Sequence, residues 1–454
     1  MRINHNISAL RSNRSLSRND KALSASIERL SSGYKINKAA DDSAGMAISR
    51  KMRTQIAALD QSGRNGSDGI SVIQTAEGAL NEITSMIQRM RELAVEAAND
   101  TYTMDDRKNI QEEIDQLCQE IDRLSEQTEY NTKNLLNGGL QRVNNANSTS
   151  VEVLSLSDEV LPAGYDFSIA EYGSSATMEM AAASGPLEGS GSIQINGETV
   201  LLNAGESADS VNEKIRDLCE CVGINWDMEE GVMSTVLAGA GQKIEVQCSE
   251  NVASLLGIST SMESEPGTDA QIELGESFSS TATVNCIGNR ISITDSEGFS
   301  LEMELDPNAE DASDEVVLTV EDAGPLIVQI GANENQEIAV AIPKISAKTL
   351  GLNYVNVRSY LGATTAISRI DEALEKVTAA RSKLGAYQNR FDSAIASLAE
   401  SEEDVTHAMS RVEDVDMAKE MTEYSSRDVL VQAGESMLAQ ANSRPQNVLT
   451  MLQM

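Results

Sequence analysis

Five cysteines are the side chains of this sequence best suited to bind a metal ion or form a disulfide: Cys118, Cys219, Cys221, Cys248 and Cys286. Cys219 and Cys221 are separated by one residue and could in principle bind a metal or form a strained disulfide. Their spacing is not that of a zinc ribbon, and no histidine lies near them. We therefore expect buried free thiols, and neither a metal nor a cofactor.

The chain has only two histidines, His5 and His407, which limits acid–base chemistry. A Ser-His-Asp triad or an H-E-x-x-H metal site needs histidine, and residues 141–325 contain none. Acidic clusters at 302–306 and 310–315 could hold calcium weakly, but they lack the glycine and spacing of an EF-hand loop. A solvated acidic surface is the favoured interpretation, and we expect no enzyme.

The 454 residues include 71 acidic and 35 basic side chains, a formal net charge of −36. This acidity argues against nucleic-acid binding, because phosphate contacts need a basic surface. No apolar run approaches the roughly 18 residues of a membrane span, so no membrane insertion is expected. The first residues lack the apolar segment of a signal peptide. A soluble protein that avoids the general secretory route is expected.

The charge is concentrated in the middle of the chain. Residues 141–325 hold 34 acidic and 5 basic residues, a net charge of −29, whereas the remaining residues are nearly balanced. The middle also reads as strands, with an Asn196-Gly197 hairpin turn and a second hairpin over 290–305. A short helix over 207–220 is predicted between them. We predict an inserted, acidic α+β domain.

Heptad spacing indicates long helices on both sides of the insert. On the C-terminal side, an apolar row recurs every seven residues: Ile370, Val377, Leu384, Phe391, Leu398, Val405 and Val412. A second row precedes it by three residues: Ile367, Leu374, Ile395 and Met409. Two further seams run over 73–97 and 110–128. Such repeats predict helices packed as a coiled-coil bundle formed by both ends of the chain.

The extreme ends carry thinner apolar stripes. One includes Ile3, Ile7, Leu10, Leu23, Ile27 and Leu30, and the other includes Met437, Val448, Leu449 and Leu452. Pro445 is expected to kink or interrupt the second stripe. The two stripes could simply pair within one monomer. Alternatively, they stay largely unfolded until subunits assemble, because thin amphipathic helices are marginal in water.

The sequence resembles a bacterial flagellin over residues 1–140 and 326–454. The matching segments are Met1-Arg-Ile-Asn-His-Asn-Ile-Ser-Ala-Leu10, the run 30–45, Gln88-Arg-Met-Arg-Glu-Leu-Ala-Val95, Gln432-Ala-Gly434 and Pro445-Gln-Asn-Val-Leu449. The resemblance implies three domains. Residues 1–42 and 413–454 would form an inner terminal-helix domain, 43–140 and 326–412 a helical bundle with a β-hairpin, and 141–325 a variable outer domain.

The resemblance also implies the function. The chain would be exported unfolded by the flagellar type III apparatus and would polymerise into the extracellular filament used for swimming. Implied partners are copies of itself, an export chaperone, the filament cap and hook-associated junction proteins. A hook–filament junction protein is the alternative, and the complete 445–449 ending favours flagellin. Flagellins are also ligands of host Toll-like receptor 5. Motif matching carries its contacts onto Arg89, Leu93 and Glu113, although charged helix faces are usually just solvated.

Overall fold

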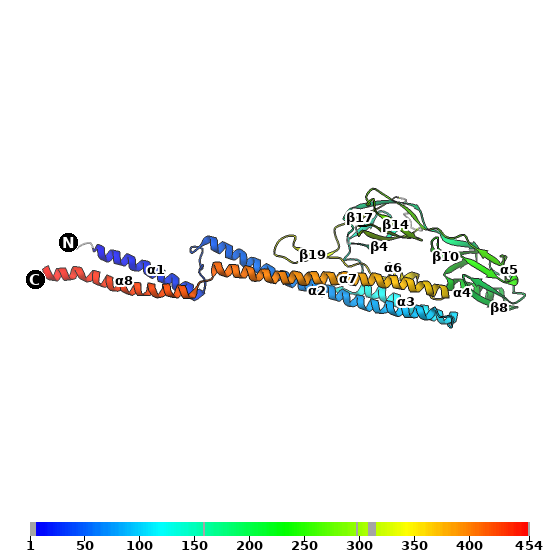
Figure 1. Ribbon diagram of the computed structural model, residues 1–454, viewed down its shortest axis with the longest axis horizontal. Helices are drawn as coiled ribbons and strands as arrows, with labels where there is room; N and C mark the ends of the chain where they lie inside the picture. Colours follow the sequence, from blue (N-terminus) through cyan, green and yellow to red (C-terminus); the bar gives the residue numbers. More distant parts are fainter. Residues whose placement is uncertain (1–5, 158, 297, 307–314, 453–454) are drawn as a thin grey trace. The chain divides into compact units, whose positions relative to one another are not determined.

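The computed structural model describes residues 6–157, 159–296, 298–306 and 315–452; in the last range the side chains of 445, 446 and 448–452 are not described. The chain forms two compact units. Unit 1 comprises residues 1–67, 329–337 and 392–454, and unit 2 comprises 68–328 and 338–391. Two long helices, α2 (Ser43–Ala97) and α7 (Tyr360–Glu413), contribute residues to both units (Figure 1).

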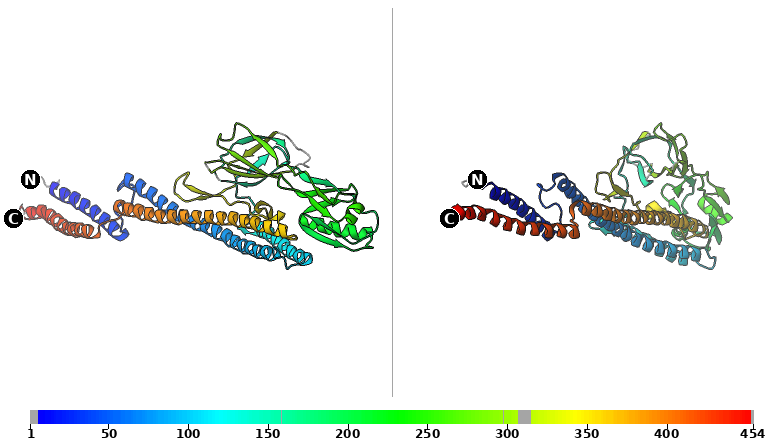
Figure 2. Two further views of the ribbon diagram at one scale, coloured as in Figure 1. Left: turned by 45° about the vertical axis from the view of Figure 1, so that its right-hand side comes forward. Right: turned by 60° about the vertical axis from the view of Figure 1, so that its left-hand side comes forward.

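In unit 1 the two chain ends form an antiparallel helix pair, α1 (Ile7–Ser32) and α8 (Met417–Leu452), which lie side by side in Figures 1 and 2. Asn6 caps α1, because its side chain accepts a hydrogen bond from the Ala9 amide at 3.1 Å. Of the two predicted effects of Pro445, a kink or an interruption, the interruption is wrong, since α8 runs through this position. Proline has no N–H for the carbonyl of Ala441 four residues earlier, and the Asn6 side chain donates to that oxygen instead, at 2.9 Å.

The helical part of unit 2 combines residues of α2 and α7 with α3 (Met104–Gln127). The seam predicted over 73–97 is confirmed, because its eight apolar members are all fully buried: Ile73, Ala76, Leu80, Ile83, Ile87, Met90, Ala94 and Ala97. In the third seam Ile110, Ile114 and Ile121 are buried, whereas Leu117 and Leu124 are half-buried. These rows form the core that holds the three helices together.

One row of α7 differs from the prediction. The row of Ile370, Val377, Leu384 and Phe391 is buried as predicted, but Ile367 and Leu374 are only half-buried. The buried companion row lies four residues before the first row, at Ala366, Ala373, Ala380 and Tyr387. Small alanine side chains at these positions let the helix backbones approach closely. The predicted second row, which was identified from its larger aliphatic residues, is therefore wrong by one position along the helix.

Short elements complete the region around the helices. They are the hairpin strands β1 (Glu129–Tyr130) and β2 (Lys133–Asn134), the pair β18 (Leu326–Gln329) and β19 (Glu337–Val340), the helix α6 (Ala347–Leu350) and the 3₁₀ turn η1 (Leu352–Tyr354). The β18–β19 pair confirms the β-hairpin expected where the chain returns from the insert.

The insert is α+β as predicted, but it contains two separate apolar cores. The first core lies between two four-stranded antiparallel sheets of order β13-β5-β17-β3 and β14-β15-β16-β4. Their strands are β3 (Asn144–Ala146), β4 (Val151–Leu156), β5 (Gly164–Glu171), β13 (Gln271–Leu274), β14 (Thr283–Ile287), β15 (Arg290–Thr294), β16 (Ser300–Leu305) and β17 (Glu315–Val320). We call these strands the sandwich module.

The second core belongs to a helix-bearing module over residues 175–263. Its sheets have the orders β6-β10-β9 and β12-β11-β7-β8. The elements are β6 (Ser175–Glu179), β7 (Gly191–Ile195), β8 (Glu198–Leu202), α4 (Ala208–Val222), β9 (Ile224–Asp227), β10 (Val232–Ala238), β11 (Glu245–Cys248), α5 (Glu250–Leu256) and β12 (Ser261–Glu263).

The predicted local elements of this module are confirmed. Asn196 and Gly197 both have positive φ, 45° and 92°, as a two-residue type I′ turn between β7 and β8 requires. Helix α4 begins after its cap Ser207, as the predicted helix over 207–220 requires, and buries Val211, Ile215 and Leu218 on one face. Among the described residues, no helix has the length and apolar character needed to cross a membrane.

Candidate assembly surface

The terminal helix pair leaves large apolar side chains in solvent. Ile7 and Leu10 of α1 are 56% and 57% exposed, and Val429 and Met437 of α8 are 63% and 59% exposed. Ile27 is also exposed, whereas Leu23 and Leu30 are half-buried. A two-helix pair can cover only one side of each helix, so part of each predicted stripe remains uncovered. Large apolar side chains left in solvent on two paired helices make this surface a candidate protein interface.

Not every predicted stripe residue can be placed. Ile3 lies outside the described residues, and so do the side chains of Val448, Leu449 and Leu452.

Polar contacts fix how α1 and α8 pair. The Arg427 guanidinium of α8 donates to the carbonyl oxygen of Ala22 and to Oγ of Ser26, both at 2.7 Å. Ser26 is fully buried, so this charge-assisted contact satisfies a hydroxyl that water cannot reach. Farther along, a Cβ added to Gly434 would lie 3.2 Å from the Leu16 side chain. These contacts set the register of the pair and decide which apolar residues stay exposed.

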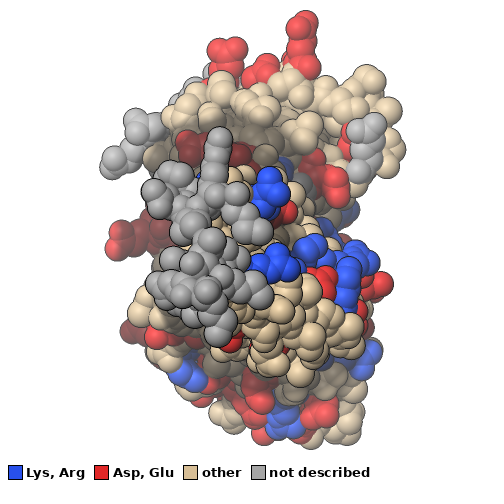
Figure 3. Space-filling model, turned by 90° about the vertical axis from the view of Figure 1, so that its left-hand side faces the viewer, with Lys and Arg blue, Asp and Glu red and all other residues tan. Residues whose placement is uncertain are grey.

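Helix α1 also carries a basic stripe, which was not among the predicted features. Its four members, Arg11, Arg14, Arg18 and Lys21, are all exposed, and their 3-4-3 spacing places them on one face of the helix. Figure 3, viewed toward the terminal helices, shows basic side chains gathered together on this side of the molecule. The 3-4-3 spacing of these basic residues could have predicted the stripe, but only the apolar residues of this segment were interpreted.

A second partly uncovered apolar row lies in the portion of α7 that belongs to unit 1. Leu398, Val405 and Val412 continue the heptad row past Phe391, but they are only half-buried. Within unit 1 the accompanying helix is α2, where Gly66 lies against Ile395. A single partner helix leaves some of the row open, so this segment also offers apolar surface to a neighbour.

The three residues carried over as receptor contacts occupy two environments. Arg89 of α2 donates from Nε to Glu113 Oε1 of α3 at 3.0 Å, and both side chains are about half exposed. Hydrogen bonds to Glu113 and Glu92 raise the pKa of Arg89. Leu93 is 2% exposed and belongs to the helical core. It therefore cannot act as a surface anchor in this conformation, contrary to the role we gave it.

The cysteines, which the sequence offered as possible metal ligands or disulfide partners, are unpaired in the part of the chain that the structure describes. All five cysteines are free; Cys219 and Cys221 are buried and the other three are half-buried. Burial raises the pKa values of the Cys118 and Cys219 thiols to about 12, which makes both unreactive. Within the described ranges no group of three or more His, Cys, Asp or Glu is placed to hold a metal ion.

The first acidic cluster, 302–306, differs from the solvated surface that we predicted. Glu302 and Glu304 are paired with Lys376 and Lys348. Most of the 310–315 cluster lies outside the described residues.

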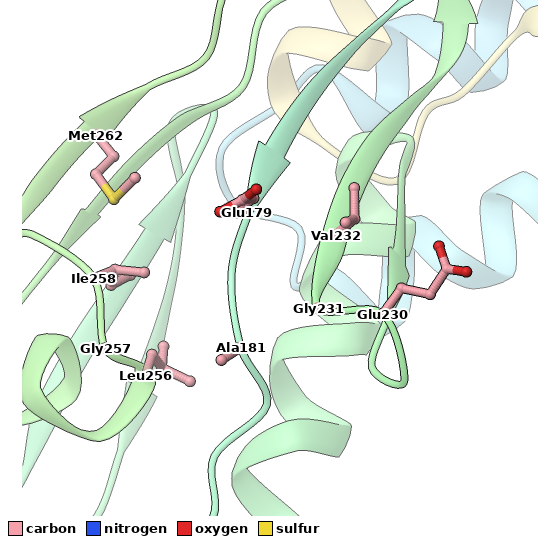
Figure 4. Close-up of a pocket in the computed structure, with 9 residues that line it drawn as sticks. All are labelled: Glu179, Ala181, Glu230, Gly231, Val232, Leu256, Gly257, Ile258 and Met262. Atoms are coloured by element: carbon pink, nitrogen blue, oxygen red, sulfur yellow. The ribbon is translucent and has the colours of Figure 1, made fainter.

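A cleft of about 530 Å³ opens in the helix-bearing module (Figure 4). Leu256, Ile258 and Met262, from the α5–β12 segment, supply its apolar side. Glu179 of β6 and Glu230, from the turn between β9 and β10, supply two carboxylates from separate elements. This lining resembles an ordinary junction between two sheets, and nothing in it points to a particular ligand.

Comparison with known proteins identifies the family of the chain. Residues 3–140 match the family described as the bacterial flagellin N-terminal helical region, and residues 367–452 match the bacterial flagellin C-terminal helical region. A flagellin of Clostridium tyrobutyricum is 34% identical over 448 residues, covering 98% of this chain and all of that protein. Flagellin D of Vibrio anguillarum and a flagellin of Bacillus subtilis are each 31% identical, over 99% and 100% of this chain and 99% and 100% of those proteins. The chain therefore belongs to the bacterial flagellin family.

Proposed function

We propose that this flagellar filament subunit polymerises by burying, between copies, the apolar stripes that α1, α8 and the end of α7 leave uncovered. The observation that carries the proposal is the exposure of Ile7, Leu10, Val429 and Met437, each more than half exposed. Burying apolar area is the main driving force of protein association. The nearly balanced charge of the helical regions removes the electrostatic obstacle to stacking that the acidic insert would present.

The proposed division into domains follows the same logic. Residues 1–42 with 413–454 form the inner layer, 43–140 with 326–412 the surrounding helical layer, and 141–325 the outer domain. The acidic charge of the outer domain favours a solvated position on an extracellular filament. Export as an unfolded chain, with a chaperone, and contacts with a filament cap and hook-associated junction proteins complete the proposal. A role as the junction protein itself is the alternative.

Electron microscopy of polymerisation tests the proposal. The full chain, seeded with filament fragments or precipitant, should form long uniform filaments. Variants lacking 1–42 or 413–454 should remain folded, as judged by circular dichroism, but should not polymerise. Filaments formed by either truncated variant would contradict the role of the terminal helices. A full chain that never forms filaments would favour the junction protein.

We further propose that Arg89 and Glu113 contact host Toll-like receptor 5. The support is their shared exposure on neighbouring helices, where the receptor could take over the hydrogen bonds that they now make to each other. An Arg89→Ala variant should bind the receptor more weakly. Arg123→Ala is the matched control, since Arg123 of α3 is equally exposed and pairs with Glu120. Equal receptor affinity of Arg89→Ala and the parent chain would remove Arg89 from the site.

A further inference from the structure

One face of the sheet β14-β15-β16-β4 of the sandwich module is mostly polar; its apolar member Ile287, opposite Arg290, is 72% exposed. Leu301, Met303 and Leu305 of β16 are buried in the module's core, so the alternate residues Glu302 and Glu304 lie on the opposite face. The residues that share this face on β15 and β16 are all polar: Arg290, Ser292, Thr294, Ser300, Glu302 and Glu304. Hydrophobic burial therefore contributes little to whatever this face contacts.

Two carboxylates on this face oppose each other. Glu304 of β16 is directly opposite Glu152 of β4 in the antiparallel register. Like charges directly opposite on neighbouring strands destabilise a sheet. Lys348 of α6, outside the insert, resolves the conflict, because its Nζ lies 2.6 Å from Glu152 Oε2 and 3.2 Å from Glu304 Oε2. The two carboxylates thus share one lysine ammonium group as their common ion-pair partner.

A third carboxylate on this face, that of Glu302, pairs with a second lysine of the helical region. Glu302 Oε2 lies 2.7 Å from Nζ of Lys376 on α7 and 2.9 Å from Nη2 of Arg290 on β15. The same Arg290 nitrogen donates to the carbonyl oxygen of Thr349 in α6 at 3.0 Å. The Tyr354 hydroxyl of η1 donates to Glu304. Most of these contacts join a polar atom of the insert to a polar atom of the helical region. The Arg290–Glu302 pair lies within the insert and orients the Glu302 carboxylate toward Lys376.

We propose that Glu152, Glu302 and Glu304 of the insert, with Lys348 and Lys376 of the helical region, form an electrostatic clasp that docks the sandwich module reversibly on α6 and α7. The charged contacts hold the docked state, and the polar composition of the face lets it separate without exposing an apolar core. Some of the insert's acidity therefore serves intramolecular recognition of two lysines as well as solubility.

The charges set the direction in which the clasp responds. Burial disfavours the ionised form of Glu302, but Lys376 and Arg290 outweigh burial and lower its pKa. Burial also opposes the charge of Lys348, but Glu152 and Glu304 outweigh it and raise the pKa of Lys348. The lowered carboxyl pKa means that docking is complete above the ordinary glutamate range and weakens as pH falls through the lowered value. Salt weakens it as well, although partly buried pairs are screened less than exposed ones.

A zero-length carbodiimide cross-linker measures docking in the full-length monomer, because it joins a carboxylate to a lysine only where the two touch. The expected products are Lys376–Glu302 and Lys348–Glu152, quantified by peptide mass spectrometry. Their yields should fall about threefold or more between roughly 0.02 and 1 M NaCl, as the Debye length shrinks to about 3 Å. The matched internal control is Lys243–Glu263, 2.8 Å apart within the helix-bearing module, which should stay close together when the clasp opens.

A substitution tests whether the contacts act as one device. In Glu302→Gln the yield of Lys348–Glu152, which lacks the altered residue, should fall about twofold or more, because Lys376 loses its partner. Glu273→Gln, an exposed carboxylate on the other sheet of the same module, should leave that yield unchanged. Circular dichroism and an unchanged Lys243–Glu263 yield would show that the variants are folded. Salt-independent yields, or an unaffected Lys348–Glu152 product in folded Glu302→Gln, would overturn the proposal.

Discussion

Replacing two apolar residues of α1 by serine should weaken polymerisation without unfolding the subunit. Ile7 and Leu10 are 56% and 57% exposed, so the α1–α8 pair uses less than half of each side chain. Complete burial of such a side chain contributes about 1.5–3 kcal/mol. If assembly covers the exposed half, each residue contributes about 1 kcal/mol to each subunit added, and the double variant loses about 2 kcal/mol.

This loss predicts a measurable change in the critical concentration for polymerisation. Because about 1.4 kcal/mol corresponds to a factor of ten, the Ile7→Ser, Leu10→Ser variant should need roughly 30 times more subunit before seeds elongate. The critical concentration follows from the protein left in the supernatant after sedimentation of seeded filaments. The α1–α8 pair also loses the covered part of both side chains, up to about 2 kcal/mol by the same arithmetic, so circular dichroism must show an unchanged helix content before the critical concentrations are compared.

The matched control is Leu201→Ser in β8, a residue 73% exposed but located in the insert. It removes a comparable apolar side chain from solvent and should leave the critical concentration unchanged. A double α1 variant that polymerises at the parent concentration would refute the assignment of the exposed stripe to subunit contacts. An equal rise for Leu201→Ser would show that apolar exposure anywhere on the chain has the same effect.

Three further outcomes are expected. Phe391→Ala, which empties a fully buried site beside Gly69, should lower the free energy of unfolding by about 3–5 kcal/mol in a urea titration. Arg427→Ala leaves the buried Ser26 hydroxyl without its donor, costs about 1–3 kcal/mol, and should speed amide exchange in α1. Cys219, buried with a pKa of about 12, should resist alkylation at pH 8 in the native chain and react in urea, because the thiolate is the nucleophile.

Local pattern was enough to predict the helices and hairpins. The 73–97 seam and the Asn196-Gly197 turn depend on neighbours within a few residues, and both are confirmed. The alanine row of α7 was missed because alanine carries little hydrophobic signal, although its small size is what allows close packing. Leu93 was misplaced for a related reason, because motif matching identifies a residue without saying which side of the helix is buried.

Contacts between distant segments could not be predicted. Glu302 and Lys376 are 74 residues apart, and the sequence of β16 shows only an alternation of apolar and acidic residues. Such alternation is typical of a solvated strand face, which is how it was interpreted. The division of the insert into two cores has the same origin, since the sandwich core gathers strands from both ends of the insert, on either side of the helix-bearing module. The order of strands in a sheet depends on pairing between distant segments, so it cannot be predicted from the residues near each strand.

The heptad row of α7 shows why an assembly surface is hard to distinguish from a core. The same seven-residue period runs from Ile370 to Val412, yet the row is buried through Phe391 and half-buried at Leu398, Val405 and Val412. The residue types do not change along the row; the number of partner helices does. Under the proposed function, a neighbouring subunit covers the apolar positions that this subunit leaves open. On that proposal the same period serves burial within one subunit as far as Phe391 and contact between subunits beyond it.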